Sequence, residues 1–151
     1  MLKQALGLLP TIGVSVLLAT APISAGETPS PANAKVYFVN LKDGATVSSP
    51  LKIVFGLSGM GVAPAGTEKG GTGHHHLFID RPSLGEGPEG KDELDANIPS
   101  DDKHKHFGKG QTETEITLTP GKHTLQLVLG DQNHIPHNPP VVSDIITITV
   151  K

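Results

Sequence analysis

The chain has 151 residues, a formal charge of −3 at pH 7 and no cysteine. A mildly acidic chain without a basic run is a poor binder of nucleic acid or anionic membranes. The lack of cysteine excludes disulfide bonds, thiol catalysis and thiolate metal sites. We therefore expect one domain of ordinary size whose stability comes from its core.

The beginning of the chain has the pattern of an export signal, which we place at residues 1–25. Lys3 supplies a positive start, residues 5–21 are almost entirely apolar, and small residues follow. Cleavage is predicted after Ala25, because Pro22 would block the alternative site just before it. The competing interpretation is an uncleaved anchor, although the apolar run is slightly short for a membrane span. We expect a periplasmic or secreted protein that has no membrane contact after cleavage.

The remaining chain divides into a short linker and one β domain. Residues 26–33 are rich in proline and serine and predict a disordered linker. Residues 34–151 contain short apolar runs separated by Gly, Pro, Asn and Asp, without a sustained helical period. This pattern predicts six strands, at residues 35–40, 51–57, 74–80, 112–118, 122–130 and 142–150.

The polar stretch of residues 81–110 is too long to be a featureless loop in a small domain. It is expected either to contain a short edge strand or to have a function of its own. With that strand the count reaches about seven. The predicted fold is therefore all-β, a single immunoglobulin-like β-sandwich that lacks the disulfide and buried Trp of antibody domains.

Histidine is the unusual feature of the composition. Seven of the eight histidines lie in three clusters, which are His74-His75-His76, His104-Lys105-His106 and His134-Ile135-Pro136-His137. Strand alternation predicts that His75 points toward the core, with Leu77, and that His74 and His76 share the opposite face. If consecutive strands alternate in direction, the three clusters meet at one end of the sandwich, and His123 lies inward at the other end.

This convergence predicts a transition-metal site, because neutral imidazole is the commonest protein metal ligand. The candidate ligands are His74, His76, His106, His134 and His137. Nitrogen donors with almost no sulfur favour copper over zinc. Other roles remain open: His75 and His123 as packed core residues, His104 as a solvated loop residue, and His134 and His137 as groups that stiffen a proline-rich loop.

Two classes of function follow from this pattern. The first is a non-enzymatic periplasmic carrier or buffer of copper, or of zinc, with the metal ion and another periplasmic protein as candidate partners. The alternative is a structural or interaction module of the cell envelope, whose histidines staple loops and bind no metal. A metalloenzyme would need an open coordination position and a general base; Asp80 or Asp131 could serve as the base, but nothing in the sequence requires it.

Several segments together resemble the bacterial family catalogued as domain of unknown function 4399. They are GHHHLFID (73–80), residues 106–140, SDIITITV (143–150) and, at the start of the domain, residues 36–66. The resemblance implies an exported β-sandwich module with no established activity. The family pattern includes His75, His76, His106, Gly108, Gln111, His123, His134 and His137, which leaves open a role beyond packing for His75 and His123.

Overall fold

Residues 28–151 are described by the computed structural model, so the predicted export signal lies outside the described residues. The described part contains nine strands and one short 3-10 helix. They are β1 (Lys35–Phe38), β2 (Thr46–Val47), β3 (Leu51–Ser58), β4 (Gly61–Val62), β5 (Thr72–Ile79), η1 (Gly90–Asp95), β6 (His104–His106), β7 (Glu113–Ile116), β8 (Gly121–Gly130) and β9 (Ile146–Val150).

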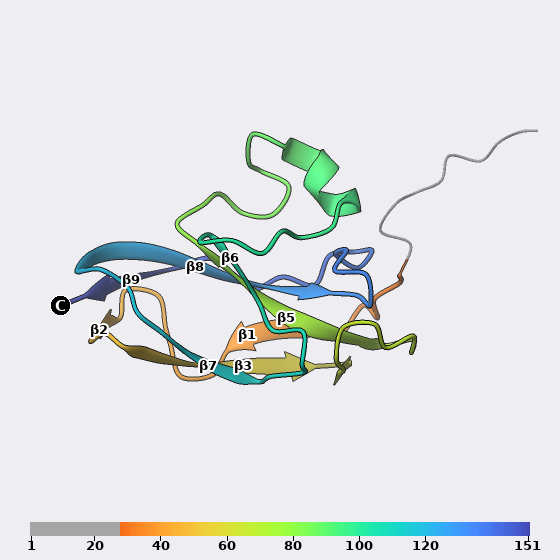
Figure 1. The fold of residues 1–151 in the computed structure, drawn as a ribbon, viewed down its shortest axis with the longest axis horizontal. Helices are drawn as coiled ribbons and strands as arrows, with labels where there is room; N and C mark the ends of the chain where they lie inside the picture. The colour runs from red at the N-terminus through yellow and green to blue at the C-terminus, as the bar shows by residue number, and fades with distance from the viewer. Residues whose placement is uncertain (1–27) are drawn as a thin grey trace, which may run out of the picture.

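The strands form two sheets that pack face to face (Figure 1). The smaller sheet has the order β1-β3-β7, and the larger has the order β2-β9-β8-β5-β4, with β6 also paired to β5. Along the chain, the longer strands alternate between the sheets: β3 and β7 lie in the smaller sheet, and β5, β8 and β9 lie in the larger one. This is the arrangement of an immunoglobulin-like sandwich. The predicted all-β sandwich is confirmed. The strand count exceeds seven because β2, β4 and β6 are only two or three residues long.

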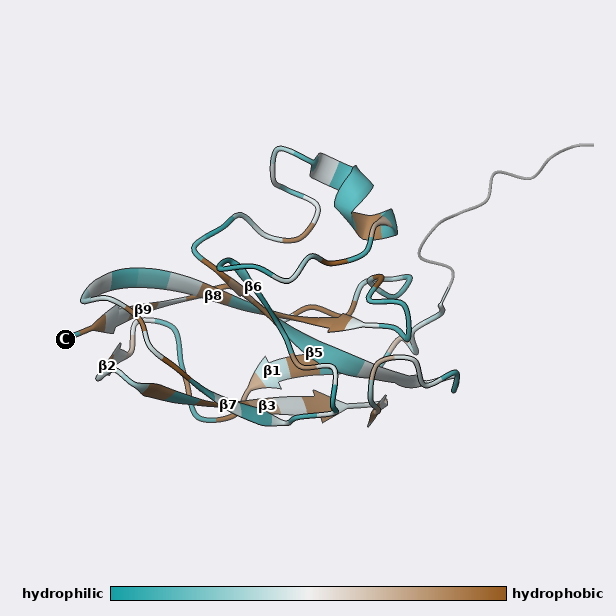
Figure 2. Cartoon of the chain, viewed as in Figure 1, coloured by the Kyte–Doolittle hydropathy of each residue, from teal (hydrophilic) through white to brown (hydrophobic). Residues whose placement is uncertain are grey.

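The main core lies between the two sheets, and alternating side chains build it. Ile53 and Phe55 on β3 face Leu125, Leu127 and Leu129 on β8, and all five are almost completely buried. The same period-2 alternation buries every second residue of β9. Brown hydrophobic segments lie along these strands in Figure 2. The core therefore rests on aliphatic side chains and phenylalanine, as the composition requires.

A second, smaller core covers the outer face of the larger sheet. Phe78 and Val128 point away from the sandwich and pack against Ile98 and the half-buried Leu84. The last two residues belong to the long segment between β5 and β6, which folds over this face together with η1 (Figure 1). Strand β5 is consequently buried on both faces, which explains why its apolar and histidine positions show no exposed side.

Two details differ from the sequence-based expectation, and one confirms it. The predicted last strand is interrupted: residues 141–143 pair with β8 through the hydrogen bonds Leu129 N to Val141 O and Ser143 N to Leu127 O, and β9 begins only at Ile146. The segment of residues 81–110 does contain a short strand, β6. Residues 28–30, predicted within a disordered linker, instead hydrogen bond with the loop at Asn138.

No helix among residues 28–151 is long and apolar enough to cross a bilayer.

Candidate metal centre

Two adjacent strands bring three histidines to the same outer face of the larger sheet. His74 and His76 are alternate residues of β5, so they point to the same side. Strand β6 runs antiparallel beside β5 and places His106 directly opposite His76. Directly paired residues of antiparallel strands share a face. The three imidazoles therefore lie next to one another, although His76 and His106 are thirty positions apart in the sequence.

A fourth imidazole comes from the loop that follows β8. The last residue of β8, Gly130, is paired with His74. The chain then turns, and His134 adopts a left-handed conformation with φ of 65°. Its Nδ1 lies 3.0 Å from His74 Nε2. The loop thus returns its histidine to the β5–β6 face.

The four side chains form one compact group of nitrogen donors, which could hold a metal ion. One ligand atom from each of His74, His76, His106 and His134 lies within 4.8 Å of all the others. Nitrogen ligands at about 2.0–2.1 Å from an ion are about 3.4 Å apart in a tetrahedral site and at most about 4.2 Å apart in any geometry, so the widest separation in the group must shorten by roughly 0.6–1.4 Å on binding.

The short contacts within the group cannot all be hydrogen bonds. His74 Nε2 lies 3.0 Å from His76 Nε2 as well as from His134 Nδ1. A neutral imidazole nitrogen carries either one proton or one lone pair, so it completes only one of these two contacts. His106 Nε2 is also buried and has no hydrogen-bond partner in the described structure. An ion at the centre would use all four lone pairs at once.

Burial keeps His74 and His76 uncharged at neutral pH. Desolvation and, to a smaller extent, the neighbouring histidines lower the pKa of His74 to about 4 and that of His76 to about 2. The pKa of His106 is also lowered, first by burial and then by His134. Only the neutral form offers a lone pair to a metal ion, so little proton release is needed before binding.

Two glycines make room for the imidazole rings. A Cβ atom at Gly130 would lie 2.8 Å from His76 Nε2, and one at Gly108 would overlap the His106 ring.

The second ring nitrogens of His74 and His76 lack hydrogen-bond partners. Both Nδ1 atoms are buried without a partner in the described structure. Metal binding through Nε2 would leave two unpaired N–H groups, an energetic cost that the metal–nitrogen bonds must offset.

His137 is not part of this group, in contrast to the sequence-based expectation. Its ring is buried, with Nδ1 3.3 Å from the carbonyl oxygen of Leu129 and Nε2 3.2 Å from that of Thr72. It links the end of β8 to the start of β5. The two histidines of the HxxH pair thus have different partners: His134 contacts His74, and His137 lies between backbone carbonyl groups of β8 and β5.

The other three histidines have structural contacts of their own. His75 points into the main core, as alternation predicts, and packs against Phe55 with a ring-centre distance of 5.0 Å. Burial lowers its pKa to about 4. His123 lies between the Asp80 carboxylate, at 2.7 Å, and the Thr119 carbonyl, at 2.8 Å.

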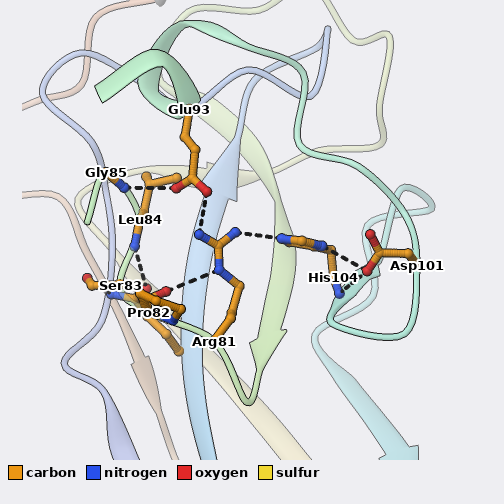
Figure 3. A network of polar contacts seen from close by, with 9 residues as sticks. Arg81, Pro82, Ser83, Leu84, Gly85, Glu93, Asp101 and His104 are labelled. Atoms are coloured by element: carbon orange, nitrogen blue, oxygen red, sulfur yellow. Dashed lines mark hydrogen bonds and ion pairs between the residues drawn. The ribbon is translucent and has the colours of Figure 1, made fainter. Parts of the chain in front are cut away.

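His104 belongs to a polar network on the same sheet face, shown in Figure 3. Arg81 donates a hydrogen bond to His104, so His104 Nε2 is the acceptor. The other ring nitrogen, Nδ1, therefore carries the proton and donates it to the Asp101 carboxylate. Arg81 also pairs with Glu93 of η1 and stacks on Phe78. No pattern in the sequence indicated this network, because its members are polar residues of a long loop without regular spacing.

The comparison with protein families decides the identity of the domain. The family model described as "Domain of unknown function (DUF4399)" matches residues 53–151. The chain belongs to this family. All four clustered histidines lie within the matched part of the DUF4399 domain, whereas β1 and β2 precede it. Searches of curated proteins and of solved structures gave no match.

Proposed function

We propose that this DUF4399 protein is an exported, non-enzymatic carrier or buffer that binds one divalent transition-metal ion, Cu(II) in preference to Zn(II). The ion would be held by His74, His76, His106 and His134. The observation that carries the proposal is the convergence of four imidazoles, from three separate segments, within 4.8 Å.

The composition of the group supports copper ahead of zinc. All donors are imidazole nitrogens, and at a given nitrogen site Cu(II) binds more tightly than the other common divalent ions of the first transition series. Met60, the only methionine among the described residues, packs against the main core rather than in the group. A thioether-based Cu(I) site is therefore not supported.

The number of protein ligands supports a carrier or buffer rather than an enzyme. Catalytic zinc sites keep one position for water or substrate, whereas four protein ligands complete a tetrahedral site. His74 and His76 are fully buried, and His106 and His134 are partly exposed. An ion would thus enter and leave along the His106–His134 side. Export is supported by the pattern of residues 1–25.

The competing function is an envelope module whose histidines only staple loops. His137, His104 and His123 do form such contacts, so the idea has a structural basis. It fails to explain the central group, where His74 Nε2 has two imidazole neighbours and His106 Nε2 has no partner. Loop staples would be expected to pair with carbonyl or carboxylate oxygens, as the other three do.

Metal titration of untagged protein tests the proposal. Elemental analysis followed by titration with Cu(II) and Zn(II) should give about one ion per chain, with Cu(II) bound more tightly. The His76→Gln/His134→Gln double variant should lose binding, and His123→Gln, far along β8 from the group, should retain it. Full affinity in the double variant, or no binding by the wild type, would refute the proposed site.

Export is checked separately by N-terminal sequencing of periplasmic protein, which should begin at Gly26.

A further inference from the structure

Asp131 is the organising group of the loop that carries His134. It is 3% exposed and follows Gly130 directly at the end of β8. Its Oδ1 accepts hydrogen bonds from the backbone N–H groups of Asn133, at 2.8 Å, and Ile135, at 3.0 Å. Two backbone bonds close the same turn, from Asp131 N to Ile135 O and from His134 N to Asp131 O. The carboxylate therefore grips the chain on both sides of His134.

The second oxygen of this carboxylate joins the loop to the start of the described chain. Thr28 Oγ1 donates a hydrogen bond of 2.6 Å to Asp131 Oδ2. The backbone continues the contact, because Asn138 N donates to Thr28 O and Ser30 N donates to Asn138 O. Residues 28–30 and the loop of residues 131–138 thus form one hydrogen-bonded unit, although about a hundred residues separate them.

His134 needs this support because its backbone is unfavourable. A left-handed conformation is energetically unfavourable at a residue other than glycine and persists only where the surroundings enforce it. With φ of 65°, His134 is in that region. The bonds to Asp131 and the bond from Ile98 N to His134 O are the constraints that hold it there.

The charge of Asp131 also reaches the imidazole group. The carboxylate is among the electrostatic influences on His74, where it acts to raise the pKa against the larger effect of burial. A divalent ion on four neutral imidazoles would bring two positive charges into a partly buried place. A nearby carboxylate offsets part of that charge, a role that acids commonly have in the surroundings of metal ligands.

We propose that Asp131 is a positioning residue of the metal site: its carboxylate, held by Thr28, fixes His134 against the β5–β6 face and supplies negative charge to the bound ion. This inference rests on the proposed metal function. Residues 28–30 would then help to complete a site whose four ligands all lie between residues 74 and 134.

Substitutions that remove one feature at a time test it, with Cu(II) and Zn(II) titration of the full untagged protein. Asp131→Asn keeps an oxygen that can accept the two backbone N–H groups but removes the charge, and it should weaken binding about tenfold or more. Thr28→Val keeps the charge and removes the hydroxyl, and it should weaken binding to a smaller extent. Asp43→Asn is the matched control, because Asp43 Oδ1 accepts a backbone bond from Thr147 at the far end of β8 and β9.

A double-mutant cycle separates positioning from general stability. Asp131→Ala removes the oxygen that holds the two backbone N–H groups as well as the charge. In a His134→Gln background, Asp131→Ala should cause much less further loss of affinity than in wild type, because the group that it positions is gone. The Cu(II) spectrum of Asp131→Ala should resemble that of His134→Gln. Equal affinity of wild type and both Asp131→Asn and Thr28→Val would overturn the inference, as would an equal loss in Asp43→Asn. If wild type itself binds no ion, the proposed function fails instead, so the two failures are distinguishable.

Discussion

At the scale of single residues, the small size of Gly130 is a requirement of the metal site rather than of the strand. A Cβ atom at Gly130 would lie 2.8 Å from Nε2, at the end of the His76 side chain. A side chain can shift at a lower energetic cost than the backbone. Gly130→Ala should therefore displace the His76 ring and weaken Cu(II) binding about tenfold or more, with only a modest loss of stability.

Gly61 provides the comparison, since a Cβ atom there would meet the Thr72 methyl group at 3.5 Å, an ordinary contact. Isothermal titration and chemical denaturation of Gly130→Ala and Gly61→Ala measure both effects. Unchanged affinity in Gly130→Ala would mean that the His76 ring does not need its present position.

His123 predicts a pH dependence of stability. The Thr119 carbonyl, first, and the Asp80 carboxylate raise its pKa above the ordinary value of 6.5, although burial opposes the shift. A raised folded-state pKa gives stability that is complete below the unfolded pKa and is lost as pH rises through the folded one. Urea denaturation of metal-free protein at increasing pH above about 6.5 should show this loss.

The His123→Gln variant should show a flatter profile over the same pH range. Parallel profiles of wild type and variant would show that another group causes the change. The buried His75 and His76 have lowered pKa values, so they reduce the stability of the folded chain in more acidic solution, where their protonation opposes folding. Their contribution therefore falls in a different range from that of His123.

At the scale of elements, an ion pair with little solvent exposure joins Arg81, shortly after β5, to Glu93 of η1 within the segment between β5 and β6. The side chains of Arg81 and Glu93 are 9% and 11% exposed, and Glu93 also accepts a bond from the Gly85 amide (Figure 3). Removing one partner of a buried pair leaves an uncompensated charge, at a cost that can reach about 3–5 kcal/mol.

Glu93→Gln should open this segment locally rather than unfold the sandwich, because the two cores are separate. Hydrogen exchange of the Leu84 and Gly85 amides should accelerate, and that of the Leu127 amide should not. Glu113→Gln is the control, since the Lys52–Glu113 pair is 58% and 57% exposed and should contribute little. Equal exchange at Gly85 in Glu93→Gln and wild type would contradict the role of the pair.

At the scale of the whole molecule, a bound ion would link strands β5 and β6 to the loop after β8. Because these segments separate on unfolding, an ion that binds only the folded chain stabilises it. The gain is about 2.7 kcal/mol when free ligand is at 100 times Kd. Calorimetry with added Zn(II) should show a higher Tm for wild type and no shift for the His76→Gln/His134→Gln variant. A shift of equal size in both would locate the ion elsewhere.

The sequence predicted much of the architecture because strand alternation is a local property. The inward position of His75 and the shared face of His74 and His76 followed from their parity with Leu77, and all are seen. The position of Phe78 on that outer face was also implied, but the second core that covers it was not. Its partner Ile98 lies in a polar loop without periodicity, so only the folded chain shows the contact.

The sequence by itself determined the all-β class and the alternation of core and outer positions, and it indicated the end of the molecule at which the histidines gather. These depend on side-chain periodicity and on turn residues, which act over a few positions. Only the tertiary structure decided that His134 joins the group and His137 does not, because the contacts that hold each ring come from other parts of the chain. No local pattern in the sequence encodes these contacts.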